Sequence, residues 1–209
     1  MSRFPPGFQD GLTDLMRWRR DVRRFRGDPV DEALLAQCLD SFLYAPSVGL
    51  SEPWRILRVD SDAARAAALA NFQAANADAL AGYAGEKASL YSRLKLSGMQ
   101  EAPVQLAVFC DEATAKGAGL GAGTMPEMRR YSVVAAITQF WLTARAHGLG
   151  VGWVSILDPA RLARDLGADR DWALVAYLCV GWPEAESQTP ELEQAGWENR
   201  RGTLPVVSV

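Results

Sequence analysis

The chain has 209 residues, of which 49% are hydrophobic, so it can bury a core of its own and its length fits a single domain. Its formal net charge of −3 argues against a protein that coats nucleic acid. No apolar run approaches the ~20 residues of a membrane span, and the first residues lack the apolar stretch of a secretory signal, so we expect a cytoplasmic protein without a membrane partner.

The first half of the chain is predicted to hold two helices with a strand between them. One helix should begin at Asp28 and Pro29, because the apolar residues that follow repeat every three or four positions, and it should end at Pro46. The segment 54–59 alternates as a strand does. A long alanine-rich helical region should then begin at about Ser61.

The second half is predicted to alternate strands with helices. The apolar segment 103–110 is typical of a buried strand, and the small residues of 111–127 are typical of an exposed or mobile loop. A central helix is predicted over 128–147, where apolar residues recur at helical spacing before Gly148. The next elements should be a strand, a helix and a strand, at 148–157, 158–167 and 172–183.

The cysteines and the histidine offer little for a disulfide or a metal site. Cys38, Cys110 and Cys179 are odd in number, far apart and set in apolar runs, which indicates buried thiols. The single histidine, His147, precedes Gly148 near a helix end, where it suits the exposed carbonyl groups. We therefore expect neither a metal site nor a Ser-His-Asp triad.

An arginine-rich segment, Arg17–Arg26, carries six arginines and one acid, Asp21. One interpretation is a solvated basic face at a helix end. The other is an anion site in which Arg19, Arg20 and Arg23 gather around a phosphate, to which guanidinium groups offer paired donors. Asp21 could relieve repulsion among the arginines by a salt bridge, or it could accept a proton or a hydrogen bond from a ligand.

Two other segments carry turn or glycine signals. In YAPSVGLSEPWR, residues 44–55, proline and glycine are consistent with a helix stop and a turn before a strand. In GLGVGWVSI, residues 148–156, alternate glycines favour either a tightly packed strand or the close approach of another backbone or a flat ligand. The GLGAG run around Gly121 lacks the strand–GxGxxG–helix spacing, so it does not indicate a dinucleotide site.

Taken together, five segments between Asp14 and Arg201 resemble the flavin-dependent nitroreductase superfamily. Within it they resemble the 5,6-dimethylbenzimidazole synthase branch, whose members consume reduced FMN. The segments, in order, are RRDVRRF, APSVGLSEPWR, SLYSRLKLSG, MPEMRRYSVVAAITQFWLTARAHGLGVGWVSIL and PELEQAGWENRR.

Single positions connect the chain to that branch. By this resemblance, Asp21 occupies the position at which ordinary nitroreductases have a serine near the flavin. Leu50 occupies the position at which they have an asparagine. Ser155 completes the set of residues that the branch is thought to use at the flavin ring. Glu52 is a departure, because the synthase pattern usually has glutamine there.

The resemblance implies an α+β fold with a mixed, mostly antiparallel sheet flanked by helices, in an intertwined homodimer with FMN at the subunit interface. Residues 1–209 would form one such domain with an extended C-terminal tail from about residue 183. Asp21 and Ser155 would be the catalytic residues, and the segment 82–98 would act as a lid over the flavin. The implied FMN-binding residues are Arg19, Arg20, Asp21, Val22, Arg23, Ser47, Lys95, Leu96, Gly152, Ser155 and Arg200.

The implied reaction is the oxygen-dependent fragmentation of reduced FMN to 5,6-dimethylbenzimidazole and erythrose 4-phosphate, which supplies the lower ligand of cobalamin. Reduced FMN would come from an external flavin reductase, and dioxygen would be the second substrate. Two alternatives stay open: an NAD(P)H-dependent FMN nitroreductase or quinone reductase, and a non-catalytic flavin-binding protein.

Overall fold

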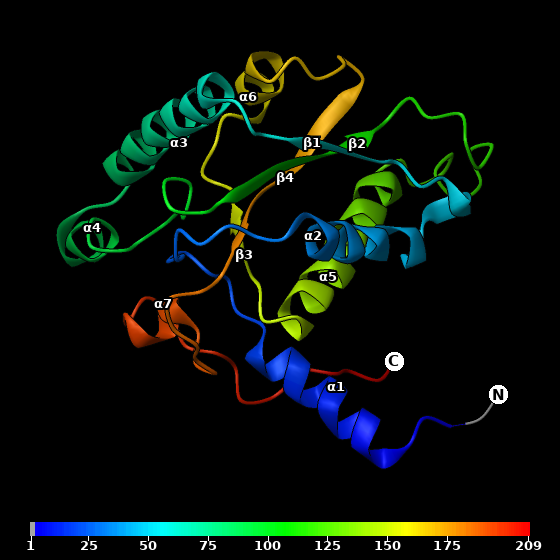
Figure 1. The fold of residues 1–209 in the computed structure, drawn as a ribbon, viewed down its shortest axis with the longest axis horizontal. Coiled ribbons are helices and arrows are strands. Elements are labelled where there is room, and N and C mark those ends of the chain that lie inside the picture. Colours follow the sequence, from blue (N-terminus) through cyan, green and yellow to red (C-terminus); the bar gives the residue numbers. More distant parts are fainter. Residues whose placement is uncertain (1–2) are drawn as a thin grey trace.

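A four-stranded sheet forms the centre of the computed structural model, which describes residues 3–209 (Figure 1). The strand order is β1-β2-β4-β3, and each neighbouring pair is antiparallel. Asp21 adds a parallel bridge to Val151 at the β3 edge. The predicted mostly antiparallel sheet is thereby confirmed, and the parallel pairing of Asp21 with Val151 is an isolated bridge outside the four strands. The strands are β1 (Trp54–Arg58), β2 (Val104–Asp111), β3 (Gly150–Val154) and β4 (Trp172–Gly181).

Helices cover both faces of this sheet, as expected for an α+β fold (Figure 1). One face packs against α2 and α5, and the other packs against α3 and α6. The α-helices are α1 (Pro6–Trp18), α2 (Glu32–Leu39), α3 (Asp62–Ala81), α4 (Gly85–Tyr91), α5 (Met128–Ala146), α6 (Pro159–Asp165) and α7 (Glu191–Gln194). Two 3₁₀ helices, η1 (Asp40–Tyr44) and η2 (Val48–Leu50), lie between α2 and β1.

Strand β2 shows how an apolar run builds both layers. Its first seven residues are buried, because alternate side chains enter opposite cores. Leu106 and Val108 join the cluster that contains α5, whereas Ala107 and Phe109 join the cluster that contains α3 and α6. The strand therefore lacks the polar-apolar alternation of a half-exposed sheet.

Helix α5 lies at the centre of its layer, as predicted. Ile137, Phe140 and Ala144 are fully buried, and their spacing of three and four residues places them on one side of the helix. His147 follows the last turn as the C-cap residue, and Gly148 has a φ of +82°. The helix thus ends with glycine in the left-handed conformation that such helix ends favour.

Side-chain caps mark where α2, α3 and α6 begin. Ser61 and Asp158 each accept a hydrogen bond from the backbone N–H three residues further on, so α3 and α6 begin where the sequence predicts. The predicted start at Asp28 is wrong. The cap of α2 is Asp31, whose carboxylate accepts a hydrogen bond from the Leu34 N–H at 2.9 Å. The helical region then continues through η1 and ends before the predicted proline.

The sequence patterns do not predict α1 or α7. Helix α1 buries none of its residues, and Phe8, Leu12 and Met16 are 41–50% exposed. The helix contacts α5, where Arg145 lies over the Trp18 ring, but it has no buried apolar face of the kind that a sequence pattern detects. Helix α7 has only four residues and lies in the tail that follows residue 183.

All three cysteines are buried free thiols, as predicted. Burial raises the pKa of Cys110 to about 11 and that of Cys179 to about 12. Within residues 3–209, no three His, Cys, Asp or Glu side chains gather as a possible metal site. No helix over the same residues has both the length and the apolarity that crossing a bilayer requires.

Candidate flavin and carboxylate site

The arginine-rich segment leaves α1 in an extended conformation and lies along β3. The Val22 N–H donates to the Val151 carbonyl at 3.0 Å. Glycine at 150 and 152 permits this contact, since a Cβ on Gly152 would lie 2.0 Å from the Val22 carbonyl oxygen, and one on Gly150 would lie 2.8 Å from the Val22 side chain. The alternate glycines of β3 therefore accommodate another backbone, one of the two predicted alternatives.

Asp21 is held in place by two groups. Its Oδ1 accepts a hydrogen bond from the Trp153 N–H at 2.8 Å, and its Oδ2 lies 2.9 Å from both Nε and Nη2 of Arg23. The carboxylate keeps 31% of its side-chain surface exposed. Asp21 thus forms the salt bridge that the sequence allows, and it remains accessible to a ligand.

Arg23 also contacts the segment 82–98. Its Nη1 donates to the Lys95 carbonyl oxygen at 3.1 Å. The Lys95 ammonium itself pairs with Glu101, and Leu96 packs against the core on the α3 side of the sheet. The structure therefore brings Lys95 and Leu96, two of the expected site residues, to the same place as Asp21 and Arg23.

Three other arginines lie near one another. The Arg19 guanidinium lies 4.8 Å from the centroid of the Trp141 ring. Burial lowers the pKa of Arg19; Asp21 acts in the opposite direction, and Arg200 lowers it further. Burial also lowers the pKa of Arg20, followed by the charge of Arg200. A set of neighbouring cations that destabilise one another is the arrangement that an anion relieves.

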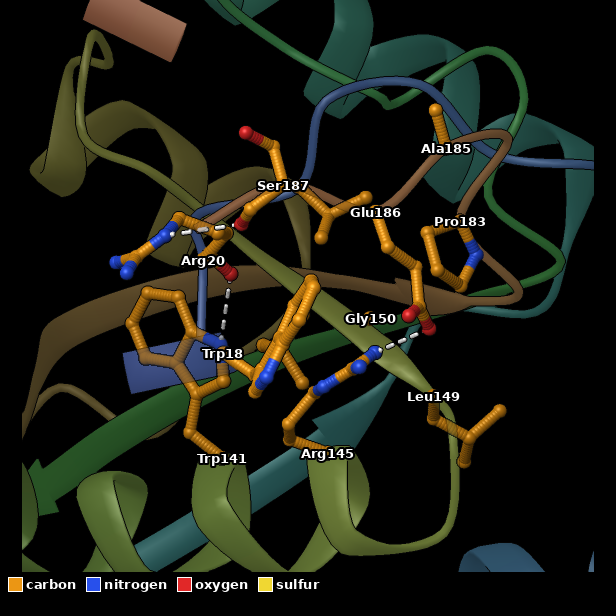
Figure 2. A pocket seen from close by; sticks show the side chains of 12 residues that line it. Trp18, Arg20, Trp141, Arg145, Leu149, Gly150, Pro183, Ala185, Glu186 and Ser187 are labelled. Atoms are coloured by element: carbon orange, nitrogen blue, oxygen red, sulfur yellow. Dashed lines mark hydrogen bonds and ion pairs between the residues drawn. The ribbon is translucent and has the colours of Figure 1, made fainter. Parts of the chain in front are cut away.

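The Arg20 side chain reaches the tail beyond residue 183 (Figure 2). Its Nε donates to the Ser187 carbonyl oxygen at 3.2 Å, and its own carbonyl accepts from the indole N–H of Trp141 at 3.2 Å. Arg145 fastens the same tail through Glu186 at 2.8 Å. The cavity between these groups measures about 20 Å³, which admits little more than a water molecule.

A larger cavity opens beside Asp21. It measures about 250 Å³ and is lined by residues of 20–24 and of the tail 184–194. Asp21 and three arginines of the segment contribute to its wall. This is the space next to the carboxylate that a ligand with an anionic group could enter.

The two serines among the expected site residues lie at different places in the fold. Ser47 lies in the loop before β1, at the sheet edge opposite β3, and its hydroxyl accepts a hydrogen bond from the Glu52 N–H at 3.1 Å. Ser155 is exposed and lies directly after β3, two residues beyond Trp153. The fold of one chain therefore brings Ser155 near Asp21 and leaves Ser47 apart.

The loop that contains Ser47 has a strained backbone. Gly49, Leu50 and Glu52 have φ values of +58°, +55° and +43°, and such conformations cost free energy in residues other than glycine. The loop packs tightly on the loop after β2, because a Cβ on Gly117 would lie 2.4 Å from the Gly49 carbonyl oxygen. The Glu52 carboxylate forms an ion pair with Lys116 of that second loop.

This pairing predicts how the departure at Glu52 is tolerated. We expect Lys116→Met to lower the free energy of unfolding by about 0.2–1 kcal/mol, since the pair is partly exposed. Glu52→Gln should be close to neutral, and Glu52→Gln combined with Lys116→Met should recover most of the loss of the single Lys116 variant. Thermal denaturation of the four proteins gives the coupling energy, and additive effects would contradict the pairing.

Aromatic residues near the site carry no predicted role. Trp197 of the tail packs edge-on against Tyr83 at 5.5 Å and Tyr91 at 6.1 Å between ring centroids, and Lys87 lies 3.8 Å from its ring. These contacts hold the tail against the segment 82–98. The position of a single tryptophan in the sequence gives no signal of such a partner.

The chain is similar to known proteins in sequence and in fold. A 5,6-dimethylbenzimidazole synthase of Rhodospirillum rubrum is 57% identical over 198 residues, covering 95% of this chain and 94% of that protein. A 5,6-dimethylbenzimidazole synthase of Rhodobacter capsulatus is 50% identical over 200 residues, covering 96% of this chain and 97% of its own length. A solved structure of oxidized iodotyrosine deiodinase bound to FMN and 3-iodo-L-tyrosine aligns with a TM-score of 0.76 at 21% identity, covering 95% of this chain and 99% of that one.

The model of the nitroreductase family matches residues 16–182, a span that runs from the end of α1 to the residue after β4. It includes the whole sheet, the arginine-rich segment and the segment 82–98. The chain belongs to the nitroreductase family.

Proposed function

We propose that the protein is an enzyme that fragments reduced FMN with dioxygen to 5,6-dimethylbenzimidazole and erythrose 4-phosphate, for the lower ligand of cobalamin. The observation that carries this proposal is the likeness to 5,6-dimethylbenzimidazole synthases at 57% and 50% identity over nearly the whole chain. It is supported by the carboxylate of Asp21, which stays partly exposed beside a cavity of about 250 Å³.

The arginines fit the phosphate of FMN. Arg19, Arg20 and Arg200 are close enough for Arg200 to lower the pKa of the other two, and a phosphate would neutralise that repulsion while accepting their hydrogen bonds. The solved deiodinase structure of the same fold contains FMN. We propose these three arginines as the phosphate ligands.

The residues around Asp21 then have distinct roles. When bound, reduced FMN supplies both the electrons for dioxygen and the ring carbons of the product. We propose Asp21 as the acceptor of a proton near ribityl C1′ and N5, and the Ser155 hydroxyl as a hydrogen-bond donor to the ring. Val22 and Gly152 would contribute backbone contacts, and Lys95 and Leu96 would exclude water as part of the lid.

We further propose a homodimer in which the partner subunit completes the site. Ser47 lies at the sheet edge opposite Asp21, so a Ser47 that contacts the same flavin would come from the partner. Large apolar side chains around that loop and the start of α5 are exposed: Leu43, Tyr44, Leu50, Leu120, Met125, Tyr131 and Val134. An apolar surface of this kind marks an interface, and a monomer mass in sedimentation at micromolar concentration would contradict the proposal.

Aeration of the protein loaded with reduced FMN tests the proposed reaction. Purified protein is mixed with reduced FMN without oxygen, then exposed to air, and the products are measured by mass spectrometry. We expect 5,6-dimethylbenzimidazole and erythrose 4-phosphate in equal amounts. Recovery of intact FMN would contradict the proposal. Rapid reduction of bound FMN by NADPH in stopped flow would favour the nitroreductase alternative and remove the need for a separate flavin reductase.

Replacing Ser155 with alanine tests its placement at the ring. We expect the 5,6-dimethylbenzimidazole formed per dioxygen consumed to fall about 3- to 10-fold, the equivalent of one lost hydrogen bond, and hydrogen peroxide release to rise. Ser155→Thr keeps the hydroxyl and serves as the matched control. A peroxidase-coupled assay that finds no rise in peroxide for Ser155→Ala would count against this role.

A further inference from the structure

The three nitrogens of the Arg23 guanidinium group are all engaged within the protein. Nε and Nη2 lie 2.9 Å from Oδ2 of Asp21, and Nη1 lies 3.1 Å from the Lys95 carbonyl oxygen. The side chain is only 14% exposed. These contacts use three of the five N–H donors of the planar guanidinium group, and the two that remain belong to a side chain with little access to solvent, which disfavours Arg23 as a phosphate ligand.

The lid segment 82–98 is held close to Arg23 from its far end. A Cβ on Gly98 would lie 2.4 Å from the Phe25 ring and 3.3 Å from the Arg23 carbonyl oxygen. Because only hydrogen fits there, the chain leaving the lid runs directly against the residues that follow Asp21. The Lys95 carbonyl is therefore delivered to Arg23 by backbone packing, and its position follows that of the lid.

The first part of the lid is fastened at a second place. Tyr83 and Tyr91 stack at 4.9 Å between ring centroids, and Trp197 packs edge-on against both. Lys87 lies over the Trp197 ring and donates to the Trp197 carbonyl oxygen at 3.0 Å. These contacts hold the first part of the lid against the tail, while Arg23 contacts both the end of the lid and Asp21.

We propose that Arg23 is a positioning residue that links closure of the lid to the orientation of the Asp21 carboxylate, and that it is not a phosphate ligand. This inference rests on the proposed function. With the lid in place, the Lys95 carbonyl fixes Nη1, and the other two nitrogens then fix Oδ2 of Asp21. When the lid moves away, Nη1 loses its acceptor, and the guanidinium group that pairs with Oδ2 is no longer fixed from the side of the lid.

If Arg23 positions Asp21, substitutions of Arg23 and of the phosphate arginines should have different effects. Loss of a phosphate ligand weakens binding of reduced FMN but not of reduced riboflavin, which has no phosphate. Loss of a positioning residue leaves that preference intact and lowers the yield of product per dioxygen. A misoriented catalytic group costs up to about 100-fold in rate, so Arg23→Lys should lower the 5,6-dimethylbenzimidazole yield about 10- to 100-fold.

The experiment compares three variants with the wild-type protein. Arg23→Lys keeps the charge and loses the planar donors, Arg200→Lys is the phosphate reference, and Arg26→Lys is the control from the same arginine run. Arg26 pairs with Asp28 at 3.3 Å and contacts neither Asp21 nor the lid. Each protein is titrated anaerobically with reduced FMN and with reduced riboflavin, then aerated, and product and dioxygen are measured.

We expect Arg23→Lys to keep the wild-type preference for FMN over riboflavin and to lose product yield. Arg200→Lys should lose the preference, and Arg26→Lys should match the wild type. If Arg23→Lys loses the preference as Arg200→Lys does, Arg23 is a phosphate ligand and the inference is wrong. An unchanged product yield in Arg23→Lys would also overturn it.

Hydrogen exchange of the flavin-free protein separates this inference from the proposed function. Arg23→Met should raise amide exchange in the segment 92–97, where the Lys95 carbonyl loses its donor, and Arg26→Met should not. Unchanged exchange in Arg23→Met overturns the link between Arg23 and the lid. The wild-type protein could show this exchange result and still make no 5,6-dimethylbenzimidazole. That combination would contradict the proposed function but not the contact between Arg23 and the Lys95 carbonyl.

Discussion

We expect Asp21→Asn to lower the rate of 5,6-dimethylbenzimidazole formation by about 10²- to 10⁴-fold, the usual contribution of a general acid or base, while binding of reduced FMN is largely kept. The carboxylate is the group that could accept a proton beside the cavity, and the arginines that would hold the phosphate are untouched. Product is measured by mass spectrometry after aeration, and binding is measured by anaerobic titration.

The structure adds a second reason for the loss. The asparagine oxygen can still accept the Trp153 N–H that Oδ1 accepts at 2.8 Å. Its amide group would then face the donors of Arg23, which now lie 2.9 Å from Oδ2. Two donors cannot form a hydrogen bond with each other. The substitution therefore removes the contact between Arg23 and residue 21 as well as the proton acceptor.

Asp21→Glu is the matched control, because it keeps the carboxylate and shifts it by one methylene group. It should retain more activity than Asp21→Asn if proton transfer is the main role, and no more if the position of the carboxylate is decisive. Product formation by Asp21→Asn at the wild-type rate, with the melting temperature unchanged, would show that Asp21 is not the base.

Local sequence patterns predict much of this fold. The apolar run of β2 indicates a strand buried on both faces, and the three-to-four spacing in α5 indicates a helix with one buried side. The side-chain caps Ser61 and Asp158 mark helix starts, because each acts within three residues of itself. Asp28 and Asp31 are equally good caps by residue type, so only the observed hydrogen bond from Leu34 decides between them.

The contacts that organise the site could not be predicted in the same way. Arg23 and Lys95 are 72 residues apart, and Lys116 and Glu52 are 64 residues apart. No periodicity connects such pairs, since they meet only after the sheet and its loops have formed. The segment Arg17–Arg26 is consistent with an anion site as well as with a solvated basic face, and it does not indicate which arginine would face an anion and which one holds Asp21.

The glycines of β3 lie between these two cases. Their alternation favours either a tightly packed strand or the close approach of a flat ligand or another backbone, and the structure shows the close approach of the Val22 backbone. The glycines that the strand pattern singles out therefore also determine where Asp21 lies. Asp21 is adjacent to Val22 and accepts the N–H of the residue that follows Gly152.

Gly152→Ala should therefore be among the most damaging single substitutions in the site. The added Cβ would lie 2.0 Å from the Val22 carbonyl oxygen, a backbone atom that can move only with the whole segment 21–25. We expect overpacking to lower the free energy of unfolding by about 1–3 kcal/mol, which corresponds to a fall of about 2–12 °C in Tm for a chain of this size.

The same displacement should also weaken the site beyond its effect on stability. Moving the segment away from β3 breaks the hydrogen bond from Trp153 to Asp21, so the product yield should fall even at temperatures where Gly152→Ala is fully folded. Gly27→Ala is the control, because a Cβ there would meet no atom within 4 Å. Calorimetry and the aeration assay at 15 °C measure the two effects. If Gly152→Ala is as stable and active as Gly27→Ala, the close approach of Val22 to β3 cannot be what fixes the carboxylate.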